Sequence, residues 1–551
     1  MSKEIAELLF ANIDKKPEYY YEKYPKRVLP EGARVTRFAP SPTGFVHIGG
    51  LFSALISERT ANLSKGVFYL RIEDTDKKRE IENGVTGIVD ALNNFNIINQ
   101  EGATSENEEK GSYGPYKQSQ RKEIYQTFIK NIIEEGKAYP CFCTSEELEK
   151  TRHKQEELNI NTGYYGEWAL YRDKSFEEIK TAFESGKSFV IRIKSNGKAD
   201  KKVSYKDVVR GELEFPENDQ DIVICKSDGI PTYHFAHVVD DYLMGTTHVI
   251  RGEEWLSSVP VHLQLFQIMG WKAPKYAHIP TILKMESTSK RKLSKRKDPE
   301  AAVSFYHEEG YPINSVLEYL LNLANSSFED WRKLNPTKSL FEFPFKIEKL
   351  GSSGALFDII KLIDLSKNVI AFIPAEEIYK NLLEWTKDYD KDFNSLIEKY
   401  KENTIKFLTI DRTGKKPRKD ISKWSDIKNL SSYIFDEIFN PEYEFPENIS
   451  KENLIEIIKN YAEVYSFDDN KDEWFNRAKD FSEKLGYAGD MKLYKENPQN
   501  FKGNISDTTN IIRVAITGRK QTPDLYEILK ILGLDRTKER LEKAVSFLSS
   551  K

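Results

Sequence analysis

Cysteine and long apolar runs are both scarce in this sequence. Three cysteines in 551 residues are too few for a disulfide framework, which excludes the small disulfide-rich secreted class and indicates a reducing compartment. No apolar run approaches the roughly 18 residues that a membrane span needs. The apolar stretch within residues 1–16 is interrupted by acidic residues, unlike that of a signal peptide. We therefore expect a cytoplasmic chain with no membrane partner.

An excess of charge of either sign is also missing. The chain has 83 lysines and arginines against 87 aspartates and glutamates, which gives a formal net charge of -4. The overall charge therefore does not indicate a polyanionic partner, and any nucleic-acid surface must be local. The hydrophobic fraction of 39% suffices for several cores. A chain of this length favours roughly three to five domains.

The phosphate-loop patterns G-x-x-x-x-G-K-[ST] and G-x-G-x-x-G are absent, but a stretch rich in proline and glycine, RFAPSPTGFVHIGG, occupies residues 37–50. The sequence ARVTRFA leading into it is typical of a strand. Residues 51–66 have a helical pattern that Gly66 closes near the C-cap position, 67–76 are typical of a second buried strand, and 81–95 of a second helix. This order predicts a parallel α/β sheet, in which ligands lie outside the carboxyl ends of the strands.

The loop at 37–50 has the composition of a phosphate site. Gly44, Gly49 and Gly50 would let backbone N–H groups approach a ligand closely. The helix N-terminus beside His47 is expected to offer free N–H donors and a partial positive charge. A simple turn with a structural histidine is the alternative interpretation of the same residues.

A second loop, KMESTSKRKLSKRK at 284–297, is rich in lysine and arginine and follows an apolar, strand-like run. A charge run of this kind is usually a solvated surface. A mobile lysine-serine loop could instead neutralise the charge that develops on a triphosphate as pyrophosphate leaves. Neither loop decides between these interpretations by itself.

The two loops together resemble those of a known family. HIGG at 47–50 resembles the His-Ile-Gly-His signature of class I aminoacyl-tRNA synthetases, and KLSKR at 292–296 resembles their Lys-Met-Ser-Lys-Ser signature. The stretches RIEDTD, GPYKQSQR and HVIRGEEW narrow the resemblance to the glutamyl-tRNA synthetases. The resemblance covers about residues 34–330 strongly and returns at 513–533.

The resemblance implies an enzyme that activates L-glutamate with ATP and magnesium to glutamyl-adenylate and then transfers the glutamyl group to tRNA(Glu). The implied fold is α/β: a class I Rossmann-like catalytic domain with an inserted domain for the tRNA acceptor end, followed by an all-α anticodon-binding half. We accordingly predict the segments 1–33 as an N-terminal helical extension, 34–114 and 231–285 as the two halves of the catalytic domain, 115–230 as the inserted domain, 286–370 as the mobile KLSKR loop with a stem-contact domain, and 371–551 as the helical anticodon-binding region.

The resemblance also implies a glutamate site, residue by residue. Rejecting the near-isostere glutamine requires cationic donors that would stay unsatisfied against a neutral amide, and Arg37 and Arg251 match those donors. Glu73 and Ser41 match the groups that hold the amino group, and His237 stands where some relatives have an asparagine near the substrate. The predicted glutamate-binding residues are Arg37, Ala39, Ser41, Glu73, Tyr233, His237 and Arg251.

The same resemblance implies an ATP site in which the protein supplies position and charge instead of a covalent nucleophile. The predicted ATP-binding residues are His47, Gly49, Gly50, Glu254, Trp255, Ser294 and Lys295. The predicted catalytic residues are His47, Lys292 and Lys295.

Cys141 and Cys143 lie where some relatives carry a zinc site. A structural zinc needs about four ligands, yet the one remaining cysteine is Cys225, and Trp168 stands near the position where a further ligand is expected. We therefore expect two thiols and no bound zinc.

Strand signals fade from about residue 370 onward, and helical patterns recur there, as in bacterial-type relatives. The last of these patterns, TPDLYEILKILG, has Thr522 as a candidate N-cap, Pro523 at the first helical position and Gly533 past the end.

Two other functions stay open from the sequence. A non-discriminating enzyme would also glutamylate tRNA(Gln), and no motif marks the anticodon-reading residues that would decide this. A tRNA-binding paralogue without ligase activity should have damaged catalytic motifs, whereas His47, Glu73, Arg251 and Lys295 are present. We expect a monomer, as is usual in the family.

Overall fold

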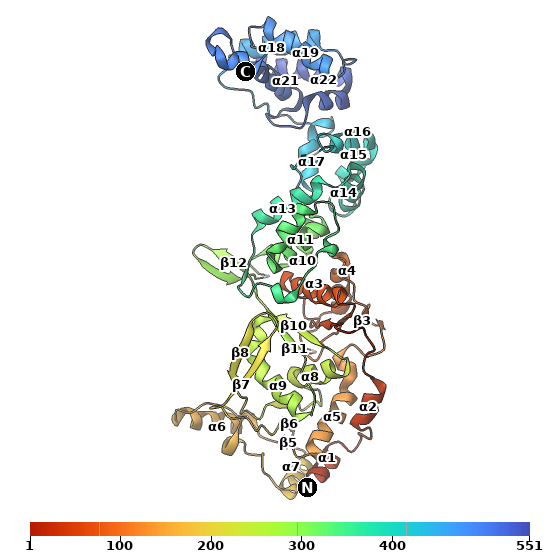
Figure 1. The fold of residues 1–551 in the computed structure, drawn as a ribbon, viewed down its shortest axis with the longest axis vertical. Helices are drawn as coiled ribbons and strands as arrows, with labels where there is room; N and C mark the ends of the chain where they lie inside the picture. Colours follow the sequence, from red (N-terminus) through yellow and green to blue (C-terminus); the bar gives the residue numbers. More distant parts are fainter. Residues whose placement is uncertain (77, 295, 415, 551) are drawn as a thin grey trace. The chain divides into compact units, whose positions relative to one another are not determined.

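The computed structural model describes residues 1–76, 78–294, 296–414 and 416–550 (Figure 1). The chain forms two compact units. The first comprises Met1–Phe305 and Leu317–Asp358, and the second comprises Tyr306–Val316 and Ile359–Lys551. All strands that the described residues form lie in the first unit, whereas the second unit is helical.

A parallel sheet lies at the centre of the first unit, as the sequence predicts. Strands β1 (Val35–Phe38), β2 (Val67–Leu70) and β3 (Glu101–Ala103) run parallel, and β4 (Glu109–Lys110) is antiparallel to β3 at the edge. All of β1 is buried, as expected for a strand covered on both faces. Burial on this strand forces Arg37 to find polar partners inside the protein.

Two further strands, parallel to each other, continue this sheet beyond β1. Strand β10 (His248–Gly252) pairs with β11 (Lys275–Ile279). β10 lies beside β1, where the N–H of Thr247 donates to the carbonyl of Val35 at 3.0 Å. The strand order is therefore β3-β2-β1-β10-β11. The chain passes from β1 to β2 on one side and from β10 to β11 on the other, and this reversal of strand order opens a crevice at the carboxyl ends of β1 and β10.

The helices around the sheet follow the predicted order of elements. They are α3 (Ile48–Leu63) between β1 and β2, α4 (Gly84–Asn94) between β2 and β3, α8 (Tyr233–Leu243) before β10, and α9 (Val259–Ile268) between β10 and β11, preceded by the 3₁₀ helix η3 (Glu253–Ser258). Figure 1 shows α3 and the pair α8 and α9 around strands β10 and β11.

Helix α3 ends differently from the sequence prediction. Lys65, with a φ of 56°, takes the left-handed position that was expected near Gly66. The N–H groups of Lys65 and Gly66 donate to the carbonyls of Asn62 and Ala61, which satisfies the helix end. Gly66 is needed for another reason, because a Cβ atom there would collide with the backbone of Arg34 at the start of β1.

Between β4 and α8 the chain leaves the sheet and forms a second group of helices and strands. Its elements are η1 (Gln118–Arg121), α5 (Lys122–Glu134), β5 (Ala138–Cys141), α6 (Ser145–Glu157), η2 (Gly166–Trp168), α7 (Phe176–Glu184), β6 (Val190–Ile193), β7 (Lys202–Asp207), β8 (Gly211–Pro216) and β9 (Val223–Cys225). Strands β5, β6 and β9 form an antiparallel sheet, and β7 and β8 form a separate two-stranded ribbon.

The first 33 residues form two helices that pack on this inserted segment. Helices α1 (Ser2–Leu9) and α2 (Pro17–Lys23) both contact α5, and α1 also contacts α7. Farther along the chain, Arg27 pairs with Glu101 of β3 at 2.7 Å and donates to the carbonyl of Met244 at 2.8 Å. The extension therefore connects the inserted segment with strand β3 and with the C-terminal end of α8.

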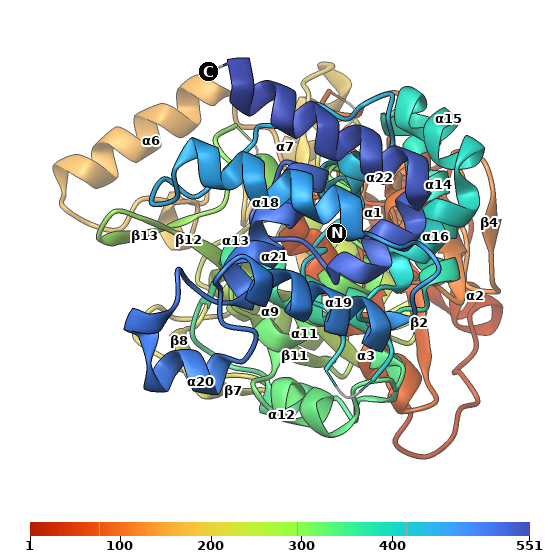
Figure 2. The same ribbon diagram turned by 90° about the horizontal axis from the view of Figure 1, so that it is seen from above.

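After β11 the chain forms a hairpin of β12 (Ile282–Glu286) and β13 (Ser289–Lys292), and β14 (Ala355–Leu356) pairs in parallel with β12. Both ribbon views show the hairpin projecting from the first unit (Figure 1 and Figure 2). The KLSKR motif therefore begins at the last residue of a projecting hairpin. The remaining helices of this unit are η4 (Pro299–Ala301), α12 (Ser327–Leu334), η5 (Leu340–Glu342) and η6 (Ile347–Lys349), and α10 (Val303–Glu308) and α11 (Ile313–Ala324) contain residues of both units.

The second unit is all helical and is built around its own hydrophobic core, which includes Ile378, Leu382, Ile458 and Ile516. Its other helices are α13 (Ile359–Ala371), α14 (Ala375–Tyr389), α15 (Lys391–Lys399), α16 (Lys401–Thr409), α17 (Asp426–Ser431), η7 (Ser432–Ile434), α18 (Lys451–Val464), α19 (Lys471–Lys484), α20 (Met491–Glu496), η8 (Pro498–Asn500), α21 (Ile505–Thr517) and α22 (Leu525–Ser550). The predicted change from α/β to all-α structure is confirmed.

Helix α22 begins otherwise than predicted. Asp524, not Thr522, caps it: the Asp524 carboxylate accepts the N–H of Glu527 at 3.2 Å. Thr522 is instead bonded to the guanidinium of Arg513. Gly533, with a φ of 79° and a ψ of 176°, is not helical and separates two helical segments, so the predicted end of the first segment at Gly533 is confirmed. Buried apolar residues such as Leu541 follow in the second segment.

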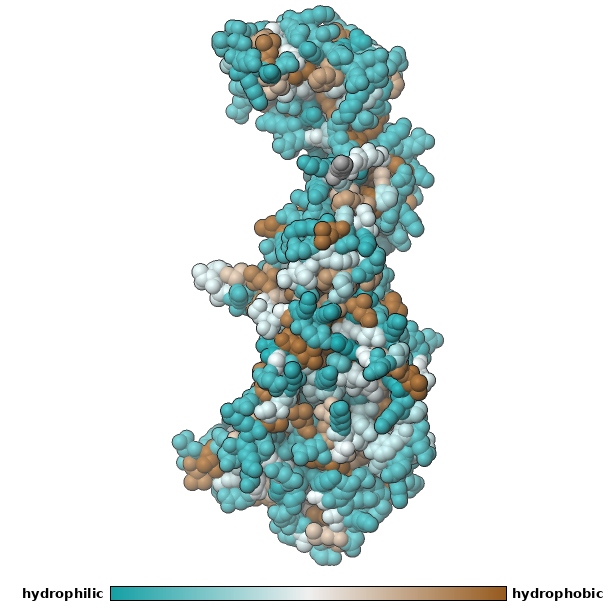
Figure 3. Space-filling model, in the orientation of Figure 1, coloured by the Kyte–Doolittle hydropathy of each residue, from teal (hydrophilic) through white to brown (hydrophobic). Residues whose placement is uncertain are grey.

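The face of the molecule in Figure 3 is largely hydrophilic, with apolar side chains scattered over it. Among the helices formed by the described residues, none is long and apolar enough to cross a membrane.

Gly66→Ala should destabilise the first unit, because the added methyl group would collide with the backbone of Arg34. We expect the free energy of unfolding, measured by urea titration, to fall by about 1–3 kcal/mol. Gly87→Ala is the matched control, since it lies in α4 with nothing within 4 Å of an added Cβ atom. That variant should gain about 0.5–1 kcal/mol from the better helix propensity of alanine. Equal effects of the two substitutions would contradict this packing.

Candidate active site

A cavity of about 540 Å³ opens at the carboxyl ends of the parallel strands, in the crevice that the strand order predicts. Arg37 comes from β1, Glu73 from the residues after β2, and Arg251 from β10. The sequence-predicted residues that line the cavity are Arg37, Ala39, Ser41, His47, Gly49, Gly50, Glu73, Tyr233, Arg251, Glu254, Trp255 and Lys292. The fold thus brings together side chains from widely separated stretches of the sequence.

Two predicted residues lie away from the cavity wall, and a third, Lys295, lies outside the described residues. The backbone N–H of Ser294 donates to Asp298 at 2.9 Å. His237 is completely buried: its Nδ1 lies 2.8 Å from a carboxylate oxygen of Asp241 and its Nε2 lies 3.2 Å from the hydroxyl of Tyr276. His237 therefore contacts Asp241 and Tyr276 instead of lining the cavity, and its role in binding glutamate stays a prediction.

The prediction for the phosphate loop also needs a correction. His47 caps α3, where its ring Nδ1 accepts the N–H of Gly49 at 3.0 Å and its carbonyl accepts the N–H of Gly50 at 2.7 Å. These N–H groups were expected to be free, but they are satisfied within the turn. Because Nδ1 accepts a hydrogen bond, a neutral His47 ring carries its proton on Nε2. The two glycines contribute a stretch of cavity wall without side chains.

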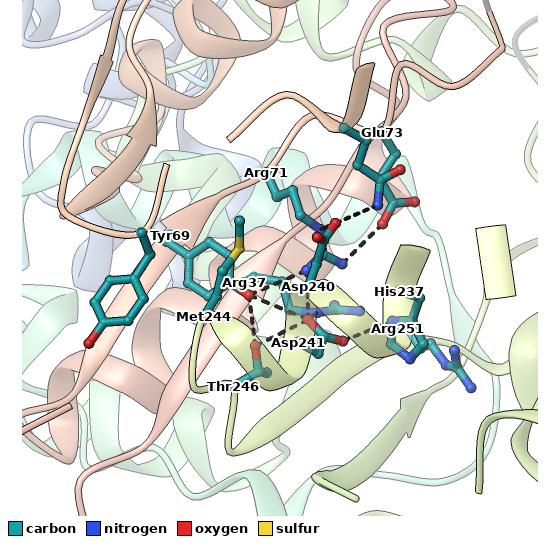
Figure 4. Close-up of polar contacts among 12 residues, drawn as sticks. Arg37, Tyr69, Arg71, Glu73, His237, Asp240, Asp241, Met244, Thr246 and Arg251 are labelled. Carbon is teal, nitrogen blue, oxygen red and sulfur yellow. Dashed lines mark hydrogen bonds and ion pairs between the residues drawn. The ribbon is translucent and has the colours of Figure 1, made fainter. Parts of the chain in front are cut away.

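A network of buried charges lies behind the cavity wall (Figure 4). Asp241, in the last turn of α8, accepts hydrogen bonds from Arg71 at 2.7 Å and from Arg37 at 3.2 Å, and Arg71 donates to Glu73 at 3.1 Å. Burial opposes the charged form of Asp241, but Arg37 and Arg71 hold its pKa well below the usual value. Burial likewise opposes the charge on Arg37, yet Asp241 keeps its pKa above the ordinary range. Arg37 is therefore charged and fixed at the cavity.

The neighbouring carboxylate, Asp240, connects α8 with the inserted segment. It accepts hydrogen bonds from Arg121 at 2.7 Å, from Tyr125 at 2.8 Å and from Gln118 at 3.0 Å. A buried carboxylate costs several kcal/mol unless donors of this kind compensate it. The aspartate pair therefore fixes α8 between the catalytic strands on one side and α5 on the other.

Arg251 is held by a different set of groups. Its Nε–H donates to His278 Nε2 at 3.0 Å, and one terminal nitrogen donates to the carbonyl of Trp255 at 3.2 Å. The other terminal nitrogen lies 3.2 Å from His262 Nδ1 and 3.4 Å from the hydroxyl of Tyr233. Burial lowers the pKa of His278 and, much further, that of His262. Both rings are therefore neutral at pH 7 and can accept hydrogen bonds from the guanidinium.

The lysine-rich loop is anchored at Asp298. The carboxylate accepts hydrogen bonds from Arg291 at 2.6 and 2.8 Å, from Lys284 at 3.2 Å, and from the N–H of Ser294 at 2.9 Å. Lys292 contributes to the lining of the cavity at the same place. The predicted approach of this loop to the site is thus seen at Lys292.

The thiols of Cys141 and Cys143, which are expected not to bind zinc, both contact the same tyrosine. Cys141 donates to the hydroxyl of Tyr164 at 3.3 Å, and the sulfur of Cys143 lies 3.4 Å from the same oxygen. In the part of the chain that the structure describes, no three His, Cys, Asp or Glu side chains are grouped as possible metal ligands. That the chain binds no zinc stays a prediction.

Sequence reasoning did not single out Arg71, Asp240, Asp241, His262 or His278. A signal for the first three was present, because each charged residue belongs to, or directly follows, an apolar stretch that the pattern predicts to be buried. A charge in such a place indicates a buried partner of opposite charge. The two histidines carry no comparable signal, since a buried histidine is ordinary.

Comparison with known protein families shows which class of protein has this architecture. The family described as tRNA synthetases class I (E and Q), catalytic domain, matches residues 34–362, and the family described as Anticodon binding domain matches residues 379–545. The parallel sheet, the inserted segment and the cavity at the strand ends are therefore those of a class I aminoacyl-tRNA synthetase catalytic domain.

Relatives that match over nearly their whole length show which family within this class the chain belongs to. The chain is 52% identical over 543 residues to a glutamate–tRNA ligase of Clostridium perfringens, covering 98% of each chain. It is 48% identical over 542 residues to one of Acetivibrio thermocellus, covering 98% of this chain and 99% of the relative. A crystal structure of a glutamate tRNA ligase from Elizabethkingia meningosepticum in complex with its amino acid matches with a TM-score of 0.76 and 27% identity, covering 94% of this chain and 100% of that one. The chain belongs to the glutamate–tRNA ligase family.

Asp241→Asn should destabilise the first unit strongly. The substitution leaves the buried guanidinium groups of Arg37 and Arg71 without their shared counter-charge. Breaking a buried ion pair in this way costs about 3–5 kcal/mol, which urea unfolding would measure. Glu123→Gln is the matched control, because it makes the same carboxylate-to-amide change in an exposed pair with Lys15. Its cost should stay below about 1 kcal/mol, and losses of similar size in both variants would refute the assigned role of Asp241.

Proposed function

We propose that this cavity activates L-glutamate with ATP to glutamyl-adenylate and that the glutamyl group then passes to tRNA(Glu). The proposal rests on one observation: two buried arginines, Arg37 and Arg251, line the same cavity as the His47 turn and Lys292. The arginines suit the carboxylates of an acidic amino acid, and the turn with its lysine suits a triphosphate. Membership of the glutamate–tRNA ligase family supports the same reaction.

Arg37 and Arg251 would bind the side-chain carboxylate of glutamate. A buried guanidinium that a glutamine amide cannot neutralise would stay desolvated and unpaired, which penalises the wrong substrate. Glu73 would receive the ammonium group of the substrate together with Ser41. Burial raises the pKa of Glu73 while Arg71 and Arg37 act against this rise, so a cationic ligand would further favour its charged form.

His47, Glu254 and Trp255 would bind ATP beside the glycine backbone at 49–50. Lys292 and Lys295 would offset the charge that develops on the leaving pyrophosphate. In the first step, the α-carboxylate of glutamate attacks the α-phosphorus and pyrophosphate leaves. In the second, a hydroxyl of the terminal adenosine of the tRNA attacks the glutamyl carbonyl and AMP leaves. Magnesium would enter with ATP as part of the co-substrate, and the protein supplies position and charge.

The helical second unit would bind the anticodon, and the inserted segment would bind the acceptor end of the tRNA. The match of residues 379–545 to an anticodon-binding family supports the first of these roles. The six segment bounds predicted from the sequence stay predictions, as do a monomeric state and a cytoplasmic location.

The non-discriminating alternative and the inactive paralogue differ from this proposal in a charging assay. Labelled glutamate would be offered with purified tRNA(Glu) and, separately, with tRNA(Gln). Glutamate on the first tRNA alone agrees with the proposal. Glutamate on both would establish the dual-specificity enzyme, and charging of neither would favour the paralogue.

Arg251→Gln should raise the KM for glutamate by about 100-fold or more, because the substrate carboxylate loses a buried charged partner. Steady-state charging of tRNA(Glu) at saturating ATP measures this. Arg27→Gln is the matched control, since the side chain of Arg27 is only 8% exposed but pairs with Glu101 away from the cavity. The KM for glutamate should change little in the control. An unchanged KM in Arg251→Gln would remove Arg251 from the glutamate site.

A further inference from the structure

A chain of hydrogen bonds runs from Arg251 through His278 to Asp207. The Nε–H of Arg251 donates to His278 Nε2 at 3.0 Å, and His278 Nδ1 lies 2.7 Å from a carboxylate oxygen of Asp207. The side chains of His278 and Asp207 are both completely buried. Asp207 is the last residue of β7, so the ribbon of the inserted segment supplies the far end of this chain.

The donors and acceptors fix the tautomer of His278. A guanidinium can only donate, so His278 Nε2 must be the unprotonated nitrogen and Nδ1 must carry the proton. That proton is donated to Asp207. The carboxylate is itself held by backbone N–H groups, from Val209 at 2.9 Å, Arg210 at 3.0 Å and His278 at 3.2 Å. The ring of His278 therefore cannot turn over without losing a hydrogen bond at each end.

His262 repeats this arrangement at another nitrogen of the same guanidinium. Its Nδ1 lies 3.2 Å from Arg251, and its Nε2 lies 3.0 Å from Nδ1 of His234. Burial lowers the pKa of His234 as well as that of His262, so these rings are neutral too. Arg251 is thus held between two neutral imidazoles.

The two arginines that line the cavity differ in whether a carboxylate contacts and balances their positive charge. Arg37 pairs directly with the Asp241 carboxylate. Arg251 has only neutral immediate partners among the residues that the structure describes: two imidazoles, a carbonyl and a hydroxyl. A neutral imidazole can orient a guanidinium without cancelling its charge, which leaves the attraction of Arg251 for an anion undiminished by a contacting carboxylate.

We propose that Asp207 and His278 are positioning residues for glutamate recognition, which hold the guanidinium of Arg251 in the orientation that meets the side-chain carboxylate of the substrate. This inference rests on the proposed role of Arg251 in binding that carboxylate. It makes the β7–β8 ribbon part of the amino-acid site, although neither residue touches the cavity.

The test compares His278→Leu and Asp207→Asn with the unaltered protein in steady-state charging of tRNA(Glu). His278→Leu removes an acceptor from a charged donor, which should raise the KM for glutamate by about 10- to 100-fold. The KM for ATP should change less than about threefold, since Arg251 is not among the residues proposed to bind ATP. Asp207→Asn should raise the KM for glutamate less, because the amide oxygen can still accept the Nδ1–H of His278.

Two further variants separate positioning from general damage. His278→Gln can accept from Arg251 with its oxygen and donate to Asp207 with its nitrogen, so it should restore part of the glutamate affinity. His248→Leu removes another buried histidine, from the same strand as Arg251, where it contacts Thr247, and should leave both KM values unchanged. If His278→Leu does not fold, His278→Gln and Asp207→Asn measure the same selectivity.

A selective rise in the KM for glutamate that His278→Gln partly reverses supports the proposal. An unchanged KM for glutamate, or an equal rise in both KM values, overturns it. Arg251→Gln measured in the same series separates this failure from failure of the proposed function. If Arg251→Gln raises the KM and His278→Leu does not, the positioning role is wrong while the glutamate site stands. If Arg251→Gln has no effect, the proposed site itself is wrong.

Discussion

Two adjacent buried carboxylates in the last turn of α8, Asp240 and Asp241, make opposite sides of the first unit depend on each other. Asp241 holds Arg71 and Arg37 of the catalytic sheet, and Asp240 holds Arg121 of the inserted segment. None of these charges could be buried alone, since an unpaired one costs several kcal/mol. Because each charge is tolerated only in the presence of the others, the relative positions of β1, β2, α5 and α8 are fixed together. The positions of these elements in turn determine the shape of the cavity.

The network leaves the cavity with two cationic groups that are held in different ways. Arg37 shares its charge with Asp241, whereas Arg251 is oriented by neutral histidines and has no contacting carboxylate among the described residues. In the proposed function, Arg37 is a fixed part of the cavity wall whose charge is balanced by Asp241. Arg251 has no such counter-charge in contact with it, so its charge is available to the carboxylate of the substrate. This division explains how a buried site can be preorganised for an anion, stay stable without one and still reject a neutral amide.

The sequence predicts the fold class and most of the cavity because both are encoded locally. The strand-loop-helix order around residues 37–50 places Arg37 and the His47 turn at the strand ends, and the resemblance to a known family adds Glu73, Arg251 and Lys292 to the cavity lining. The differences concern contacts that leave no pattern in the sequence. His237 was assigned to the substrate because it stands where some relatives have an asparagine, but its contacts with Asp241 and Tyr276 depend on how α8 packs. The N–H groups of Gly49 and Gly50 were expected to be free because the side-chain rotation that brings the His47 ring onto Gly49 leaves no pattern in the sequence. The role of His278 could not be inferred either, since its two partners, Arg251 and Asp207, stand 27 and 71 residues away.

A crystal structure of the protein with bound glutamate would test the central claim most directly, because it would show which group of the amino acid meets the two arginines. The account predicts that the side-chain carboxylate lies within hydrogen-bonding distance of the guanidinium groups of both Arg37 and Arg251, with the contacts of Arg251 to His278 and of Arg37 to Asp241 unchanged. A glutamate bound with its α-carboxylate at these arginines, or an Arg251 that leaves His278 to reach the ligand, would contradict a preorganised site for the side chain.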